Sequence, residues 1–303
     1  MPELPEIETI KRYLEKDLIG RKIKDVKILN KKSFIGDKRK ILNSKILKIE
    51  RRGKMLIFKL DADKRTPHQK FDAGRPKPCS ALVWDGSQRT CLPARQGLTR
   101  INSIGLNLVF HLKLTGQLTF YYTNGNESLN KWQRIKNISY TNGNEFLNEW
   151  QRIKYTRVIF ILDKGFLIFN DARKFGWVKV LDDEDLNNEL SKIGKEPFDL
   201  NFKYLKEIFS KTKRPIKIVL MDQGKIAGLG NIYANEALFL AKIHPLKPAN
   251  KLKDSEIKSL LSAIKKVIKK AIKLQGTSFR FYIKPDESKG SYQEEFLVYQ
   301  RKN

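Results

Sequence analysis

Hydrophobic side chains recur every three or four positions near the beginning of the chain and predict a helix over residues 5–19. The apolar stripe of this helix consists of Ile7, Ile10, Leu14 and Leu18. Gly20 follows the stripe, at a position where glycine commonly ends a helix. The chain therefore begins with one amphipathic helix that has a single apolar face to bury.

Beyond this helix the apolar positions alternate or run on continuously, with many β-branched and aromatic side chains, which is typical of strands. Such runs lie at 22–29, 44–60, 106–122, 157–172 and 175–181. The fourth run turns at Asp163, Lys164 and Gly165 and predicts a β-hairpin. One helix followed by roughly six to eight strands with short turns favours an antiparallel sandwich or barrel, with the helix packed on it.

From about residue 185 the period of the apolar positions changes from two to 3.6, which predicts helices. These helices are expected at 202–211, 215–222, 231–243 and 253–275. For the last one we expect Asp254 or Ser255 as the N-cap and Gly276 as the terminator. The change of period divides the chain into a β-rich domain, 1–184, and a helical domain, 185–303.

Two stretches interrupt these patterns. Residues 62–104 show no periodicity and hold several prolines, so they are interpreted as an insertion between two strands. The segment 122–136, YTNGNESLNKWQRIK, recurs at 140–154 as YTNGNEFLNEWQRIK, with thirteen of fifteen positions identical. This similarity is too high for an old structural repeat and indicates a recent tandem duplication. We expect 62–104 and the duplicated loop, 122–154, to lie on the surface.

The chain carries a large positive charge, with 61 Lys and Arg against 33 Asp and Glu and a net charge of +28. Basic residues occur along the whole length, and such a charge favours a polyanionic partner. A nucleic-acid-binding protein is the first interpretation. A membrane-surface protein, a ribosomal-RNA-bound protein and a generally lysine-rich proteome are the alternatives. The 40% of apolar residues is enough for a core and excludes a disordered composition.

No apolar run approaches the roughly 18 residues of a membrane span, and no signal-peptide pattern occurs, so we expect a soluble cytoplasmic protein. The two cysteines, Cys79 and Cys91, are too few for a four-ligand zinc site and are interpreted as free thiols. No cofactor is expected.

The first residues, MPELPEIET, admit two interpretations. In one, Pro5 and the carboxylates of Glu6 and Glu8 are ordinary N-terminal helix chemistry. In the other, removal of Met1 leaves the secondary amine of Pro2 free to attack a sugar C1′. The resulting iminium ion would acidify the C2′ proton, and the adjacent Glu3 could protonate the ring oxygen as the sugar opens.

Three further stretches contain candidate chemistry. In RRGKML, Lys54 follows a glycine and precedes an apolar strand, and an ordinary surface lysine at a turn is the alternative. In NDARKFGW, Arg173 beside Phe175 is typical of a wedge into a base stack, although a turn with a buried phenylalanine fits as well. In DQGKIAGLGNIYANEALF, two glycines precede a helix that opens at Asn231, where backbone N–H groups would suit a phosphate.

Seven motifs occur in the chain in the following order: MPELPEIET, RRGKML, VFHLKLTGQL, NDARKFGW, LMDQGKIAGLGNIYANEALF, IHP and FLVYQR. In this order and approximate spacing the sequence resembles the bacterial formamidopyrimidine-DNA glycosylase family, over nearly all of residues 1–60 and 105–301. The resemblance implies an α+β fold: an N-terminal β-sandwich with a leading helix, then a helical domain with a helix–two-turns–helix element. It also implies excision of oxidised purines, such as 8-oxoguanine and formamidopyrimidines, followed by β,δ-elimination, by a monomer acting on double-stranded DNA in the bacterial nucleoid.

The resemblance further implies catalytic roles for four residues. Pro2 corresponds to the Schiff-base nucleophile and Glu3 to the proton donor. Glu6 corresponds to an assisting carboxylate, and Lys54 to a lysine near the phosphates and the lesion.

Eight residues are implied to bind DNA: His111, Leu114, Arg173, Lys174, Phe175, Lys217, Asn231 and Tyr233. Arg173 and Phe175 match a pair that fills the void left by the extruded base, and Leu114 stands where the family usually has a third, methionine wedge. Asn231 and Tyr233 match a phosphate-gripping part of the helix–two-turns–helix.

The sequence departs from the family pattern after VYQRKN, where the family usually continues into a four-cysteine zinc finger. We therefore expect a chain truncated before the finger, with no metal site. Leu4 stands where the related oxidised-pyrimidine branch usually has glycine, which favours purines. That pyrimidine branch, a catalytically impaired DNA-binding remnant and a general basic nucleic-acid-binding protein remain as alternatives.

Overall fold

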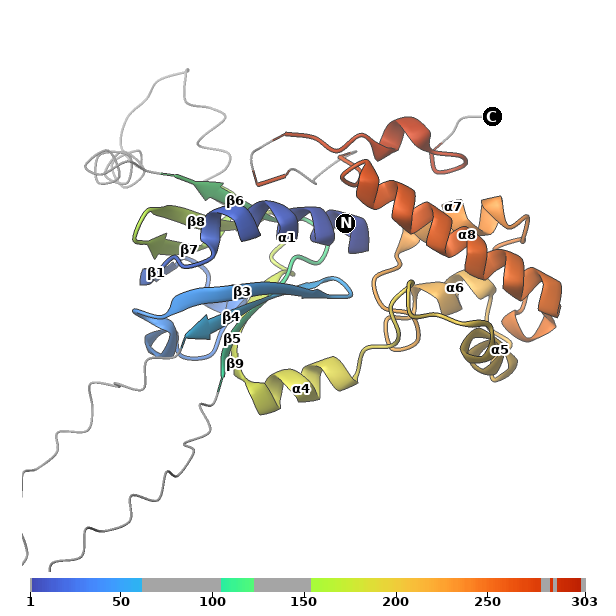
Figure 1. The fold of residues 1–303 in the computed structure, drawn as a ribbon, viewed down its shortest axis with the longest axis horizontal. Coiled ribbons are helices and arrows are strands. Elements are labelled where there is room, and N and C mark those ends of the chain that lie inside the picture. The colour runs from blue at the N-terminus through green and yellow to red at the C-terminus, as the bar shows by residue number, and fades with distance from the viewer. Residues whose placement is uncertain (1, 62–104, 123–153, 279–283, 286–287, 301–303) are drawn as a thin grey trace, which may run out of the picture.

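The computed structural model consists of a β-rich part and a helical part side by side, joined by α4 (Figure 1). It describes residues 2–61, 105–122, 154–278, 284–285 and 288–300. The predicted insertion at 62–104 and nearly all of the duplicated loop lie outside the described residues.

The β-rich part contains two sheets. The first has the order β1 (Ile23–Ile28), β7 (Thr156–Leu162), β8 (Gly165–Asp171) and β6 (Gly116–Tyr121). The second has the order β2 (Phe34–Ile35), β9 (Trp177–Asp182), β5 (Leu106–His111), β4 (Met55–Asp61) and β3 (Lys45–Arg52). All pairs are antiparallel except β2 with β9. The ring of Phe110 lies 5.6 Å from Phe160 and 6.4 Å from Phe169 in the other sheet, so the sheets face each other as a sandwich.

The first helix, α1 (Leu4–Leu18), lies along β3 and closes one side of the sandwich (Figure 1). Its predicted stripe is confirmed, because all four of its residues are buried in the same hydrophobic cluster as the inner faces of both sheets. The predicted hairpin at 157–172 is also confirmed, with β7 and β8 joined at Asp163 and Lys164.

Two predicted strand runs each fold as two strands joined by a turn. The run 44–60 folds as the hairpin β3–β4, which turns at Gly53 with a φ of +56°. The run 106–122 passes from β5 in one sheet to β6 in the other, through a turn at Lys113 with a φ of +52°. Lys54 lies in the first of these turns and Leu114 in the second, and both belong to the site described below.

The four predicted helices are confirmed as α5 (Phe202–Ser210), α6 (Ile216–Met221), α7 (Asn231–Leu240) and α8 (Asp254–Lys273). A fifth, α4 (Asp183–Ser191), was not predicted, because its acidic sequence buries only Leu186. Short 3₁₀ segments lie at η1 (Lys31–Ser33), η2 (Lys38–Ile41), η5 (Ala249–Lys251) and η6 (Tyr292–Glu295). No helix in the described ranges is long and apolar enough to cross a membrane.

The ends of α8 show one correct and one wrong prediction. Its N-cap is Lys253, whose backbone N–H donates to Glu256 at 2.8 Å, and the predicted caps Asp254 and Ser255 are inside the helix. The Asp254 carboxylate instead accepts from Lys206. At the other end Gly276, with a φ of +77°, donates to the carbonyl of Ala271 and terminates the helix as predicted.

A second hydrophobic cluster fills the helical part, and Leu4 at the start of α1 belongs to it. The first helix therefore contributes to both cores: its stripe to the sandwich and its first residue to the helical part. This places the N-terminal residues at the junction of the two parts (Figure 1). The domain division at residue 184 stays a prediction.

Candidate active site at the N-terminal residues

Glu3 is the N-cap of α1 and is almost completely buried at the junction. Its Oε1 accepts a hydrogen bond from the backbone N–H of Ile232, at the start of α7, at 3.0 Å. Its Oε2 has no hydrogen-bond partner among the described residues. Burial raises the pKa of Glu3 to about 7, against a lowering effect of the nearby Lys54 charge. A carboxyl group with this pKa and a free oxygen can act as a general acid near neutral pH.

Glu6, one helical turn later, holds the first residues in place. Its carboxylate accepts the backbone N–H of Glu3 and that of Thr277, both at 2.8 Å. It also accepts a hydrogen bond from the Tyr233 hydroxyl. Burial raises the pKa of Glu6, and these hydrogen bonds oppose that rise. Three donors leave Glu6 committed to positioning, since it links α1 to α7 and to the residues after α8.

The burial of Tyr233 corrects one predicted role. Its side chain is fully buried, its hydroxyl is bound to Glu6, and its ring packs 5.4 Å from that of Tyr292. No surface of Tyr233 is left for a DNA phosphate, so the predicted phosphate contact is replaced by support of Glu6. The sequence signal failed because the partner carboxylate lies 227 positions away along the chain.

Two glycines allow the helical part to approach the N-terminal residues closely. A Cβ at Gly230 would overlap the carboxyl group of Glu3, and a Cβ at Gly228 would lie 2.6 Å from Cδ1 of Leu4. The backbone N–H of Leu4 also donates to the Gly228 carbonyl at 3.1 Å. The sequence GLGN, interpreted above as a possible phosphate site, thus contacts the chain's own Glu3 and Leu4, and its glycines leave the space that these residues occupy.

Lys54 lies in the β3–β4 turn and is 7% exposed. Burial lowers its pKa, and the carboxylates of Glu3 and Glu6 oppose this effect.

His111 lies at the end of β5, where burial, with the charges of Lys113 and Lys54, lowers its pKa to about 3. Its Nδ1 accepts the backbone N–H of Lys113, so the neutral ring carries its proton on Nε2.

The predicted void-filling residues lie on two adjacent turns. Leu114 is half-buried in the β5–β6 turn, while Arg173, Lys174 and Phe175 are exposed in the turn after β8. Phe175 is 56% exposed, and the Arg173 guanidinium lies over its ring at 5.5 Å. The alternative of a buried phenylalanine in this turn is therefore wrong.

Asp171, which the sequence analysis did not single out, joins these two turns. It is almost fully buried and accepts hydrogen bonds from the Thr115 hydroxyl and from the backbone N–H groups of Arg173 and Gly176. The Arg173 N–H also donates to the Thr115 hydroxyl at 3.1 Å. One carboxylate thus fixes the wedge residues of both turns relative to each other.

The remaining predicted residues have fewer contacts. Pro2 is buried directly before Glu3. Asn231 is the first residue of α7 and is half-buried, as is Lys217 in α6.

In the part of the chain that the structure describes, no group of three or more His, Cys, Asp or Glu side chains forms a metal site. Cys79 and Cys91 lie outside that part.

Comparison with known proteins identifies the family. Residues 1–178 match the formamidopyrimidine-DNA glycosylase N-terminal domain, and residues 193–283 match the H2TH domain of the same glycosylase. The chain belongs to the formamidopyrimidine-DNA glycosylase family. This membership confirms the predicted enzyme class, a DNA glycosylase, and the predicted fold class.

Individual relatives align over almost the whole chain. The formamidopyrimidine-DNA glycosylase of Ligilactobacillus salivarius is 32% identical, and that of Desulforamulus reducens 33%, each alignment covering 99% of this chain and 88% of the relative. A Lactococcus lactis FPG mutant in complex with Fapy-dG containing DNA superposes with a TM-score of 0.71 at 29% identity. Lactococcus lactis Fpg in complex with an abasic site containing DNA superposes with a TM-score of 0.70 at 28% sequence identity. Each superposition covers 98% of this chain and 88% of that one.

Proposed function

We propose that this glycosylase is bifunctional: it excises oxidised purines from double-stranded DNA through a Schiff base on Pro2, and then cleaves the abasic strand by β,δ-elimination. The observation that carries the proposal is the buried Glu3 carboxyl group beside Pro2, with one oxygen unpartnered and a pKa of about 7. Lactococcus lactis proteins of similar fold were solved with lesion-containing and abasic DNA, which supports the same class of substrate here.

The proposed chemistry begins when Met1 has been removed and the Pro2 amine is free. The amine attacks the sugar C1′, and the damaged base leaves with the electrons of the C1′–N bond and takes up the proton that the amine loses. The ring oxygen then leaves C1′ as Glu3 protonates it. The resulting iminium ion draws electrons from the C2′–H bond, so that loss of this proton expels the 3′ phosphate. A second elimination expels the 5′ phosphate, and water then releases Pro2.

The neighbours of Glu3 support this assignment. Glu6 fixes the backbone N–H of Glu3 and thereby the direction of the residue that carries the acid. Lys54 brings a buried positive charge near Glu3 and Glu6, and we propose that it binds the DNA phosphate next to the lesion. The neutral His111 can donate from Nε2 to a phosphate oxygen. All proposed steps use the amine and carboxyl groups of the chain, so we propose that no cofactor takes part.

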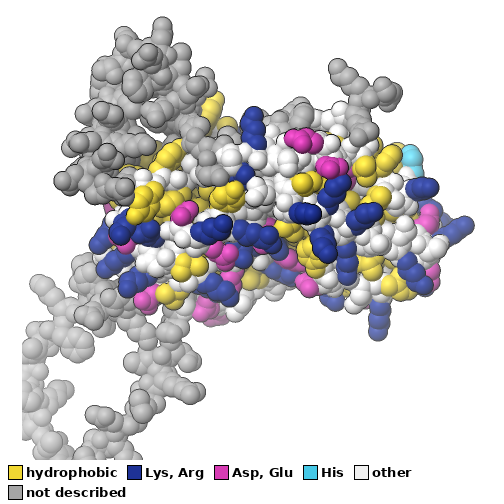
Figure 2. Space-filling view, turned by 45° about the horizontal axis from the view of Figure 1, so that its top comes forward, with side chains coloured by type: hydrophobic (Ala, Val, Ile, Leu, Met, Phe, Trp, Pro, Cys, Tyr) yellow, Lys and Arg dark blue, Asp and Glu magenta, His cyan; other side chains and the backbone are white. Residues whose placement is uncertain are grey.

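Reaching C1′ requires the damaged nucleotide to leave the base stack, at a cost of a few kcal/mol. We propose that Phe175 and Leu114 enter the duplex and that the guanidinium of Arg173 fills the space left by the base. On the face drawn in Figure 2, Lys and Arg side chains occur over both parts of the molecule. This distribution supports sequence-independent binding to the phosphate backbone and an association with the nucleoid.

Borohydride trapping tests the proposal. The purified chain, with its intact mass measured to establish removal of Met1, is incubated with a duplex containing 8-oxoguanine opposite cytosine. We expect a covalent adduct, and mass spectrometry of the digested adduct should place the sugar remnant on residue 2. The Pro2→Gly variant should lose most of the adduct.

Other outcomes assign other functions. An adduct on a lysine side chain would contradict the Pro2 mechanism. Tight, salt-sensitive binding to lesion-containing duplex without any adduct would indicate a DNA-binding remnant. Faster excision of an oxidised pyrimidine than of 8-oxoguanine would assign the chain to the related pyrimidine branch.

A further inference from the structure

The position of Lys54 depends on the turn that carries it. Among the described residues its ammonium group makes no hydrogen bond or ion pair, although the side chain is 7% exposed. A lysine without a partner of its own is held only by its backbone and by packing. Whatever fixes the β3–β4 turn therefore fixes the distance from Lys54 to Glu3.

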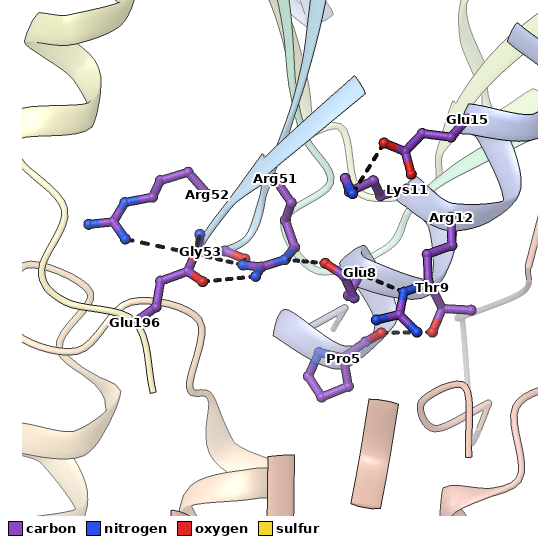
Figure 3. Close-up of polar contacts among 10 residues, drawn as sticks. All are labelled: Pro5, Glu8, Thr9, Lys11, Arg12, Glu15, Arg51, Arg52, Gly53 and Glu196. Carbon is purple, nitrogen blue, oxygen red and sulfur yellow. Dashed lines mark hydrogen bonds and ion pairs between the residues drawn. The ribbon is translucent and has the colours of Figure 1, made fainter. Parts of the chain in front are cut away.

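Arg51, near the end of β3 and two residues before Gly53, is bound on three sides (Figure 3). Its two terminal nitrogens donate to the two carboxylate oxygens of Glu196 at 2.6 and 2.8 Å, and its Nε donates to Glu8 of α1 at 2.9 Å. It also donates to the Gly53 carbonyl at 3.3 Å. All three charged side chains are largely buried, so water competes little for these bonds.

Glu196 also holds the turn directly. Its Oε1 accepts the backbone N–H of Gly53 at 2.6 Å (Figure 3). Arg52 donates to the carbonyl of Gly194 at 2.9 Å. Residues 194–196 belong to the connection between α4 and α5, and Lys195 pairs in turn with residues 226–227 beside Gly228. The β3–β4 turn is thus hydrogen-bonded to residues 194–196, which pair with the segment before Gly228, and Gly228 in turn binds the backbone of Leu4.

We propose that Arg51 and Glu196 are positioning residues that clamp the β3–β4 turn and so hold Lys54 at the catalytic carboxyl group. Arg51 joins the helix that carries Glu3, the turn that carries Lys54 and the connection into the helical part. The inference that this matters for catalysis rests on the proposed function, whereas the clamping of Lys54 does not.

The energetics favour a geometric purpose for this cluster. Desolvating an arginine and two carboxylates is costly, and apolar side chains of similar volume are often as stabilising as a buried ion pair. A bidentate guanidinium–carboxylate pair offers what apolar packing lacks, a defined direction and distance. The burial of Arg51 among Glu8, Glu196 and the Gly53 backbone is therefore best explained by the precision that it gives to the turn.

The first test measures the position of Lys54 without using its activity. The folded chain is treated with an amine-acetylating reagent, and modification of each lysine is followed by mass spectrometry. In the wild type we expect Lys54 to react far more slowly than the exposed Lys24. Glu196→Gln and Arg51→Met should accelerate modification of Lys54 toward the rate of Lys24. Equal rates at Lys54 in the wild type and in both variants would overturn the proposal.

The second test measures the consequence for catalysis. Single-turnover excision should be about 10- to 100-fold slower in either variant, with little change in duplex affinity. In a Lys54→Met background, excision is slow and is followed over hours. There the same substitutions should lower the excision rate by less than about a further twofold, since they act through Lys54. If the rate losses caused by the clamp substitution and by Lys54→Met multiply in full in the double variant, the clamp does not act through Lys54.

Arg12→Gln is the matched control. Arg12 also donates to Glu8, at 2.8 Å, but it is exposed and does not touch the turn. It should change neither the acetylation of Lys54 nor the excision rate. If Arg51→Met does not fold, Glu196→Gln decides alone, because it keeps one acceptor oxygen. If the wild type forms no adduct with DNA, the proposed function fails, while the acetylation rates still decide the clamp.

Discussion

The Glu3 carboxyl group binds its proton more tightly in the folded chain than in the unfolded chain. Burial raises the pKa from the ordinary 4.5 to about 7, so stability falls as the pH rises between these values, because only the unfolded chain releases the proton there. The difference corresponds to about 3 kcal/mol above pH 7.

Glu3→Gln should therefore be close to the wild type in unfolding free energy at pH 4 and more stable by up to about 3 kcal/mol at pH 8, measured by urea denaturation. Excision should fall by about 10²- to 10⁴-fold, because glutamine cannot supply a proton. A variant that excises at the wild-type rate would show that Glu3 is not the acid.

Tyr233→Phe removes one of the three donors to the Glu6 carboxylate. We expect a loss of about 1–3 kcal/mol in unfolding free energy, since a buried carboxylate is left under-satisfied. Tyr204→Phe is the control, because the hydroxyl lost there donates only to the neutral carbonyl of Lys225, at 2.7 Å. Equal losses in the two variants would contradict the special dependence of Glu6 on Tyr233.

The two wedge turns depend on Asp171, so Asp171→Asn should disturb them together. The amide replaces one acceptor oxygen by a donor and leaves one turn N–H without a partner. Excision of 8-oxoguanine should slow more than incision at a preformed abasic site, because only the former needs a base to be extruded. Single-turnover rates on the two duplexes measure the ratio.

Asp163→Asn provides the comparison for this prediction. Asp163 caps the turn at the other end of β8 and accepts from the backbone N–H groups of Lys22 and Lys164. Its substitution should leave both rates unchanged. A similar slowing on the two substrates in Asp171→Asn would indicate general destabilisation rather than misplaced wedges.

Elements with a strong period were predictable from the sequence, and their connections were not. The stripe of α1 and the long face of α8 determined those helices locally. The polar residues 50–54 left a turn near Lys54 open, whereas the turn at Lys113 lies between the apolar residues Leu112 and Leu114 and was not separated from its strands. The two-residue β2 is too short to show alternation, and it forms only by pairing with β9.

The candidate site was predictable only as far as its chemistry is local. Pro2, Glu3 and Glu6 stand together in the sequence, but their supports come from residues far along the chain. Ile232 lies 229 positions from Glu3, and Thr277 lies 271 positions from Glu6. Arg51 had one available signal, its place three residues before Lys54. Glu196 had none, since its partners are defined only by the folded chain.

The charge of the whole molecule determines how binding responds to salt. Duplex affinity should fall steeply as the salt concentration rises, with a slope set by the number of phosphates neutralised. If the half-buried Lys217 binds a DNA phosphate, Lys217→Gln should reduce the magnitude of this slope by about one. Phe175→Ala should lower affinity for lesion-containing duplex without changing the slope, because it removes no charge. Affinities measured at several salt concentrations separate the two effects.

The burial of Leu4 in the helical cluster, beside Gly228, has a consequence for biosynthesis. The ribosome adds Leu4 among the first residues, yet its neighbour Gly228 is made only after more than two hundred further residues have been added. Until then the nascent N-terminus has no place to dock, and Glu3 remains solvated and ionised like any other acid. The N-terminal residues can therefore take up their folded positions only when synthesis of the helical part is nearly complete.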